Sequence, residues 1–148
     1  MINDVYNARI LEYAGNIPLT DRLEAPEATA KAHSKLCGST VTVDINLDGD
    51  TIADYAHDVK ACALGQASSS IVATKVIGAT TQEVRDARDA MYKMLKEEGL
   101  VPSGRFEDLK YFEPVRDYKA RHASILLVFD ALDSAISEIE AKRQNDAA

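Results

Sequence analysis

Two cysteines and one histidine are the side chains of this sequence best suited to chemistry. Cys37 precedes a run of alternating residues, Cys62 precedes a predicted helix, and His122 lies at the start of the last predicted helix. Rigid scaffolds present ligand-binding groups at such strand and helix ends. A helix N-terminus also offers free N–H groups and partial positive charge, which suit a thiolate as nucleophile or metal ligand. The spacing therefore predicts a thiolate site at Cys62, with the alternative that this cysteine is a small buried apolar residue.

The segment after Cys37 predicts a strand and a hairpin. Polar and apolar residues alternate strictly from Thr40 to Leu47, which is typical of a half-buried strand. The turn sequence Asp48-Gly49-Asp50 then predicts a hairpin with a second strand that begins at Thr51. The weaker alternation over residues 55–61 predicts a third strand or a continuation of the second. Residues 18–35 contain two prolines and no clear period, and they predict an extended loop.

Apolar residues at helical spacing predict four helices. The first begins after Asn3 or Asp4 and ends at Gly15, and the second follows Cys62 and ends at Gly78. A capping box at residues 80–83 starts the third helix, which ends at Gly99. Residues 100–119 predict a loop with one or two helical turns. The last helix starts at residues 121–124 and carries an apolar stripe formed by Ile125, Phe129, Leu132, Ile136 and Ile139.

This order of elements predicts an α+β fold with two layers. A small antiparallel sheet of about three strands is expected, with the helices packed on one face. The length of 148 residues suits one domain over residues 1–148, and the polar residues 142–148 are expected to be a frayed tail.

Composition excludes several classes of protein. The net charge of −7 gives no electrostatic footprint for nucleic acid, and the longest apolar run, 125–129, is too short to span a membrane. The N-terminus lacks the pattern of a secretory signal, so a reducing, cytoplasmic location is expected. Two cysteines exclude a disulfide framework and a zinc ribbon of paired Cys-x-x-Cys motifs.

Three motifs in order carry a family resemblance. They are Leu36-Cys37-Gly38 before the strand, Ala61-Cys62-Ala63 followed by the small-residue stretch 64–70, and Lys119-Ala120-Arg121-His122-Ala123-Ser124. Together they resemble the NifU/IscU/SufU family of iron–sulfur cluster assembly scaffolds, and the long stretch between Cys62 and Ala123 is more similar to the SufU branch.

The resemblance implies a non-catalytic scaffold with the SufE/NifU/IscU-like fold, which binds iron or a nascent cluster and passes it to acceptor proteins. It implies cysteine desulfurase and acceptor proteins as partners. Cys37, Cys62 and His122 match the positions of two site cysteines and a site histidine in this family. The implied group is a transient iron–sulfur cluster, such as 2Fe-2S, or a single zinc or iron ion, because thiolates are the soft ligands that such centres require.

Two positions depart from the family pattern. Ser39 stands where the family has an aspartate, and Ala123 stands where it has a third cysteine. A tetrahedral zinc ion or a two-iron cluster needs four ligands, and one subunit offers Cys37, Cys62 and His122. Either a homodimer shares a cluster through Cys37 and Cys62 of each subunit, or one subunit holds a labile zinc or iron ion completed by water.

Other functions remain as alternatives. Cys62 could accept a persulfide from a cysteine desulfurase without a metal, or the chain could be a zinc-binding degenerate homologue that acts as an interaction module. A cysteine hydrolase that uses Cys62 and His122 would need an oxyanion hole, and the sequence offers none. His33 and His57 are expected to be solvated, and the serines Ser68, Ser69 and Ser70 are expected to serve helix packing.

Overall fold

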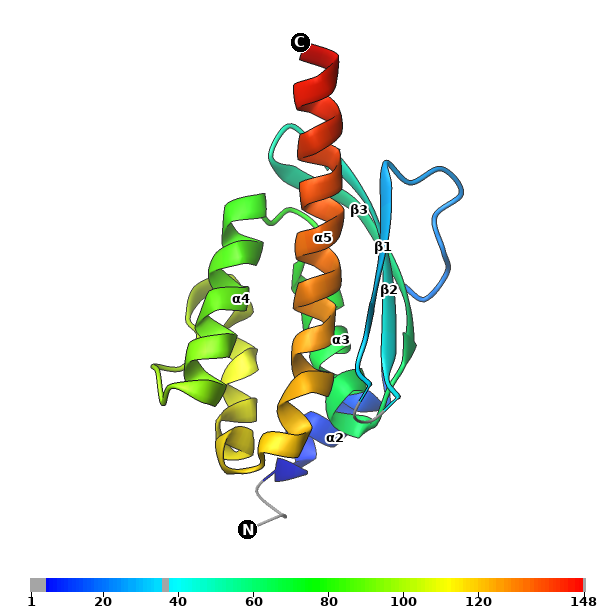
Figure 1. Ribbon diagram of the computed structural model, residues 1–148. Coiled ribbons are helices and arrows are strands. Elements are labelled where there is room, and N and C mark those ends of the chain that lie inside the picture. The colour runs from blue at the N-terminus through cyan, green and yellow to red at the C-terminus, as the bar shows by residue number, and fades with distance from the viewer. Residues whose placement is uncertain (1–4, 36–37, 148) are drawn as a thin grey trace.

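The computed structural model describes residues 5–35 and 38–147, which form two layers (Figure 1). One layer is a three-stranded antiparallel sheet, and the helices cover one of its faces. The expected two-layer α+β architecture is therefore confirmed. In chain order the elements are α2 (Ala8–Ala14), β1 (Ala28–His33), β2 (Thr40–Asp48), β3 (Thr51–Lys60), α3 (Ala63–Lys75), α4 (Thr81–Lys96), the 3-10 helices η1 (Gly104–Asp117) and η2 (Lys119–Arg121), and α5 (His122–Ala147).

β2 and β3 form the predicted hairpin. The turn between them contains Gly49, whose φ of 60° is rarely adopted by a residue with a side chain. β3 is a single strand of ten residues, so the segment that begins at Tyr55 continues the second strand of the hairpin. It is not a third strand.

The third strand of the sheet is β1, which lies where the sequence predicts an extended loop. It pairs antiparallel with β2, with Ala28 opposite Ile45 and His33 opposite Thr40. The loop prediction is wrong for these six residues because their core-facing side chains are alanines, which have low strand propensity. Pairing with β2 and packing against α5 define this strand, not a local apolar pattern.

Side-chain caps define two helix starts, and the one at α4 is where the sequence predicts it. Thr80 and Glu83 form a capping box at α4, because each side chain accepts a hydrogen bond from the other residue's backbone N–H at 3.0 Å. α2 begins later than expected, and the Asn7 side chain caps it by accepting from the N–H of Ile10 at 3.0 Å. The proposed caps in residues 3–4 lie outside the described residues.

α5 lies along the sheet and carries the main apolar stripe (Figure 1). All five predicted stripe residues are buried. The helix extends to Ala147, and near its end Lys142 donates to the carbonyl of Glu27 at 3.1 Å and Arg143 to that of Gly49 at 2.8 Å. Neither α5 nor any other helix of the described residues is both long and apolar enough to cross a membrane.

The segment between α2 and β1 covers the edge of β3 and the outer face of the sheet. The N–H of His57 on β3 donates to the carbonyl of Leu19 at 3.0 Å. Farther along, Arg22 donates two hydrogen bonds, of 2.6 and 2.8 Å, to the carboxylate of Asp44 on the central strand. Asp44 is fully buried as a result, and these bonds hold its pKa below the ordinary value.

His57 is buried, and the prediction of a surface histidine is wrong. It lies opposite Val43, so its ring faces the helices, where it packs edge-on against Tyr55 at 5.3 Å. Its Nε2 lies 2.8 Å from the carbonyl oxygen of Pro18. Burial lowers the pKa of His57 below 6.5.

Candidate functional site

The strand register brings two of the motif segments to one end of the sheet. Thr40 begins β2, Lys60 ends β3, and these two residues are paired. The residues just before β2, 38–39, and those just after β3, 61–62, therefore lie at the same end. The sheet thus accounts for how segments far apart in the sequence meet.

Cys62 is a partly exposed free thiol at the N-cap of α3, as predicted. Its side chain makes no capping hydrogen bond to the N–H groups of its own helix. Instead, its Sγ donates to the Oγ of Ser124 at 3.3 Å, and Ser124 donates in turn to the carbonyl of Arg121 at 3.2 Å. The thiol therefore lies between the first turns of α3 and α5, on a residue that is partly exposed and partly packed against the core.

Gly65 makes the close approach of these two helices possible. A Cβ atom at this position would lie 2.7 Å from the Cβ of Ala61 and 3.1 Å from the backbone oxygen of Ser124. One turn along, the hydroxyl of Ser68 donates to the carbonyl of Ile125 at 2.7 Å. A glycine and a small polar residue thus let the start of α5 pack directly against α3, in agreement with the predicted structural role of this stretch.

His122 is buried at the first residue of α5. Its Nε2 lies 3.0 Å from the carbonyl oxygen of Val115 and 3.1 Å from that of Arg116. Carbonyl oxygens only accept, so Nε2 carries the proton and donates to both. In the neutral ring Nδ1 then keeps the lone pair, and it is the atom that could bind a metal.

The structure describes both residues that depart from the family pattern, Ser39 and Ala123. Ser39 is buried, and its carbonyl accepts from the N–H of Ser34 at 2.9 Å. Ala123 lies between His122 and Ser124 in the first turn of α5, and its methyl group has no ligand atom. At this site, neither residue offers a charged metal ligand.

The structure places two of the three predicted site residues. Cys62 and His122 lie at the starts of α3 and α5, whereas Cys37 lies outside the described residues. Within residues 5–35 and 38–147, no group of three or more His, Cys, Asp or Glu side chains could hold a metal ion. The three-ligand set of Cys37, Cys62 and His122 therefore stays a prediction.

Two further residues belong to this end of the molecule. Ser124 is the hydrogen-bond partner of Cys62, which sequence reasoning missed because 62 positions separate the two. His33, expected to be solvated, is exposed and lies at the end of β1 opposite Thr40. The sequence does not predict that His33 ends a strand, because β1 is defined by its pairing with β2.

Comparison with known sequences shows similar proteins over nearly the whole chain. Residues 5–146 match the family described as NifU-like N terminal domain. The iron-sulfur cluster assembly scaffold protein IscU of Thermotoga maritima is 22% identical over 135 residues, which are 91% of this chain and 94% of that protein. The protein of the same name from Streptococcus pyogenes serotype M1 is 23% identical over 135 residues, covering 91% and 84%. Both names describe scaffolds and not enzymes, as expected.

Solved structures agree with this assignment. A crystal structure of a nitrogen-fixing NifU-like protein (N-terminal) from Brucella abortus has a TM-score of 0.94 and 63% identity, and covers 95% of this chain and 98% of that one. A putative iron-sulfur cluster assembly scaffold protein for the SUF system from Fervidobacterium islandicum AW-1 has a TM-score of 0.82 at 24% identity, covering 90% and 97%, which shows the same fold. The chain belongs to the NifU-like N-terminal domain family, within the group that its three motifs predict.

Proposed function

We propose that this protein is an iron–sulfur cluster assembly scaffold that receives iron and sulfide, holds the nascent cluster at Cys37, Cys62 and His122, and passes it to acceptor proteins. The sulfide would come from a cysteine desulfurase. The names of the similar proteins support the scaffold role, and the ligand residues are our inference.

The observation that carries this proposal is the environment of the Cys62 thiol. It is partly exposed, it does not cap α3, and it faces the first turn of α5, which begins with His122. Cargo that must be both loaded and released needs such a ligand near the surface. A thiolate is also the ligand type that iron and sulfide clusters require.

Ligand number distinguishes two forms of the proposal. Because Ala123 and Ser39 supply no strong ligand, one subunit is short of the four ligands of a two-iron cluster. Two subunits that each contribute Cys37 and Cys62 would complete a four-thiolate shell at a symmetric interface. A single subunit would instead hold one labile zinc or iron ion on Cys37, Cys62, His122 and water.

Anaerobic reconstitution with iron and sulfide tests the proposal. The wild type should gain iron, sulfide and visible absorbance, and Cys62→Ala should lose all three. Ser124→Ala is the matched control, because it removes the neighbour of Sγ and leaves the thiol. Metal without sulfide would favour the mononuclear site, co-elution of a dimer with the cluster would favour sharing, and no bound metal in any sample would reject both forms.

A gain-of-ligand variant makes the test sharper. Ala123→Cys adds a thiol in the same helical turn as Ser124, which contacts Cys62. If the cluster lies between α3 and α5, this variant should retain more iron and sulfide than the wild type after desalting. Equal retention would show that this position does not face the cargo.

Sulfur relay is a second candidate, because Cys62 is accessible and a persulfide needs no other ligand. The Cys62 thiolate would attack the outer sulfur of the desulfurase persulfide, and the desulfurase cysteine would leave as a thiolate. Intact mass after incubation with a desulfurase and cysteine tests this. One added sulfur that is absent in Cys62→Ala supports the relay, and an unchanged mass rejects it.

A further inference from the structure

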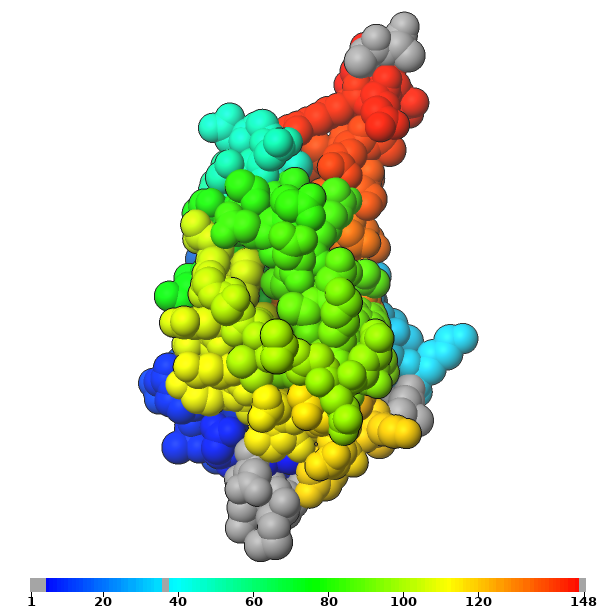
Figure 2. Space-filling model, turned by 90° about the vertical axis from the view of Figure 1, so that its left-hand side faces the viewer, coloured from blue at the N-terminus to red at the C-terminus, as the bar shows by residue number. Residues whose placement is uncertain are grey.

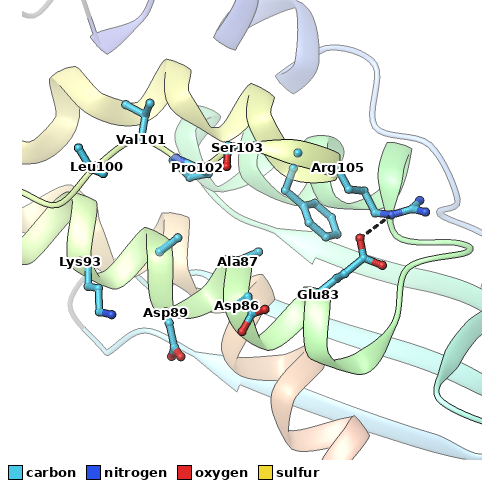
Figure 3. Close-up of a pocket in the computed structure, with 13 residues that line it drawn as sticks. Glu83, Asp86, Ala87, Asp89, Lys93, Leu100, Val101, Pro102, Ser103 and Arg105 are labelled. Atoms are coloured by element: carbon cyan, nitrogen blue, oxygen red, sulfur yellow. Dashed lines mark hydrogen bonds and ion pairs between the residues drawn. The ribbon is translucent and has the colours of Figure 1, made fainter.

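A surface groove of about 700 Å³ lies between α4 and the segment 100–106, which follows α4 in the chain (Figure 3). α4 lies on the side of α5 that is opposite to the sheet (Figure 1). Figure 2 shows the molecule from this side. The groove therefore lies apart from the sheet and its end near Cys62. A role for this groove is independent of cluster binding at Cys62.

One wall of the groove presents apolar side chains to solvent. Leu100 is 92% exposed and Val101 is 40% exposed. The backbone beside them is well anchored, because the N–H of Gly99 donates to the carbonyl of Lys93 at 2.8 Å, and Arg116 donates to the carbonyl of Gly99 at 3.1 Å. The backbone that leads into Leu100 is thus anchored at Gly99, which reduces the backbone entropy lost when a partner binds.

The opposite rim, on α4, carries two carboxylates without a cation. Asp86 accepts a hydrogen bond only from the neutral side chain of Gln82, at 2.8 Å, and no cation of the described residues pairs with Asp86 or Asp89. Glu83, by contrast, is paired with Arg105 at 3.3 Å, as the dashed line in Figure 3 marks. With Lys93 one turn from Asp89 on the same helix, this rim therefore carries a net charge of −1.

Between the two walls the floor is made by small side chains. Ala87 and Ala90 line the groove from α4 and leave room for an incoming side chain. Lys93 lines the end near Leu100, and the two free carboxylates outnumber it. Figure 3 shows the apolar segment on one side of the groove and the carboxylates of Asp86 and Asp89 along the outer side of α4. This arrangement suits a ligand with an apolar centre and positive flanks that reach across the helix.

We propose that this groove docks a short segment of a partner protein that carries apolar side chains flanked by lysine or arginine. The apolar side chains would lie over the alanine floor against Leu100, and the cations would pair with Asp86 and Asp89. At this groove a second copy of the chain would bring a net charge of −7 to the carboxylates of α4, so a basic segment of another protein is favoured over it.

Fluorescence anisotropy with labelled peptides tests this proposal on the full chain. The probe has the core Lys-Arg-Leu-Leu-Lys-Arg, a second peptide replaces both leucines with serine, and a third replaces all cations with glutamate. The first peptide should bind saturably, and both others should bind about tenfold more weakly or not at all. Absence of saturable binding by the first peptide would overturn the proposal.

Variants locate the binding. Asp86→Asn with Asp89→Asn should weaken binding about tenfold and reduce its dependence on salt. Leu100→Ser should weaken it at unchanged charge. The matched control is Asp21→Asn with Glu24→Gln, which removes the same charge from two exposed residues of the segment between α2 and β1. An equal loss in this control would show attraction to the overall charge and would refute the groove.

Discussion

Replacing Gly65 with alanine tests the contact that brings α5 to the Cys62 site. The new Cβ would lie 2.7 Å from the Cβ of Ala61 and 3.1 Å from the backbone oxygen of Ser124, both closer than normal packing. Overpacking of this kind destabilises by about 1–3 kcal/mol, whereas exchanging glycine for alanine within a helix stabilises by about 1 kcal/mol. The expected net change is a loss of about 1 kcal/mol in the free energy of unfolding.

Urea denaturation measures this loss as a lower midpoint at an unchanged slope. Gly15→Ala is the control, because a Cβ there would come no closer than 3.4 Å to its nearest neighbour, the Leu11 oxygen, and the residue has a right-handed φ of −83°. That control should keep the stability of the wild type. If Gly65→Ala were as stable as the wild type or more so, the two helices would not depend on a close approach at this residue.

Three further predictions concern buried or capping groups. Because burial lowers the pKa of His57 below 6.5, the unfolded chain binds a proton that the native state excludes; the free energy of unfolding should therefore fall as the pH drops below 6.5, and His57→Gln should flatten that dependence in denaturation series. Asp44→Asn should destabilise by about 1–3 kcal/mol at neutral pH, seen as a lower melting temperature, since it weakens the charged hydrogen bonds from Arg22. The lowered pKa of Asp44 means that this contribution is present above pH 3.8 and is lost as the pH falls further. Thr80→Ala should lose about 1 kcal/mol in urea denaturation, because the N–H of Glu83 loses its capping acceptor.

The elements that were predicted correctly are those whose signals are local. The capping box at Thr80 and Glu83 involves residues three apart, and the β2–β3 hairpin depends on alternation and a turn glycine. The stripe of α5 follows helical spacing alone. In each case the residues that determine the element are close neighbours in the chain.

The misjudged features depend on contacts between distant segments. β1 has alanines where a typical strand has larger residues, so its pairing with β2 defines it. Asp44 lies on the polar side of its strand, as alternation predicts, but its complete burial depends on the segment that contains Arg22, 22 residues earlier. His57 had a usable signal, since it alternates with Tyr55 and Val59 and so shares their side of the strand.

At the candidate site, sequence placed the thiol but not its surroundings. Small and capping residues after Cys62 predicted a helix start there, and the structure places one at Ala63. Ser124, the hydrogen-bond partner of the thiol, lies on α5, and the carbonyl groups that bind His122 lie on η1. No local sequence pattern links either element to α3. The order of motifs in a sequence can indicate which residues share a site. The contacts between those residues can be identified only from the folded structure.

The contacts that position α3 and α5 around Cys62 do not involve the side chain at position 123. Gly65 packs against the backbone oxygen of Ser124, and the ring of His122 is held by the carbonyl oxygen of Val115. Because these contacts are made to backbone atoms, an alanine at position 123 changes the number of available ligands and leaves the helix positions as they are. This is why Ala123→Cys is expected to alter metal retention with little effect on stability.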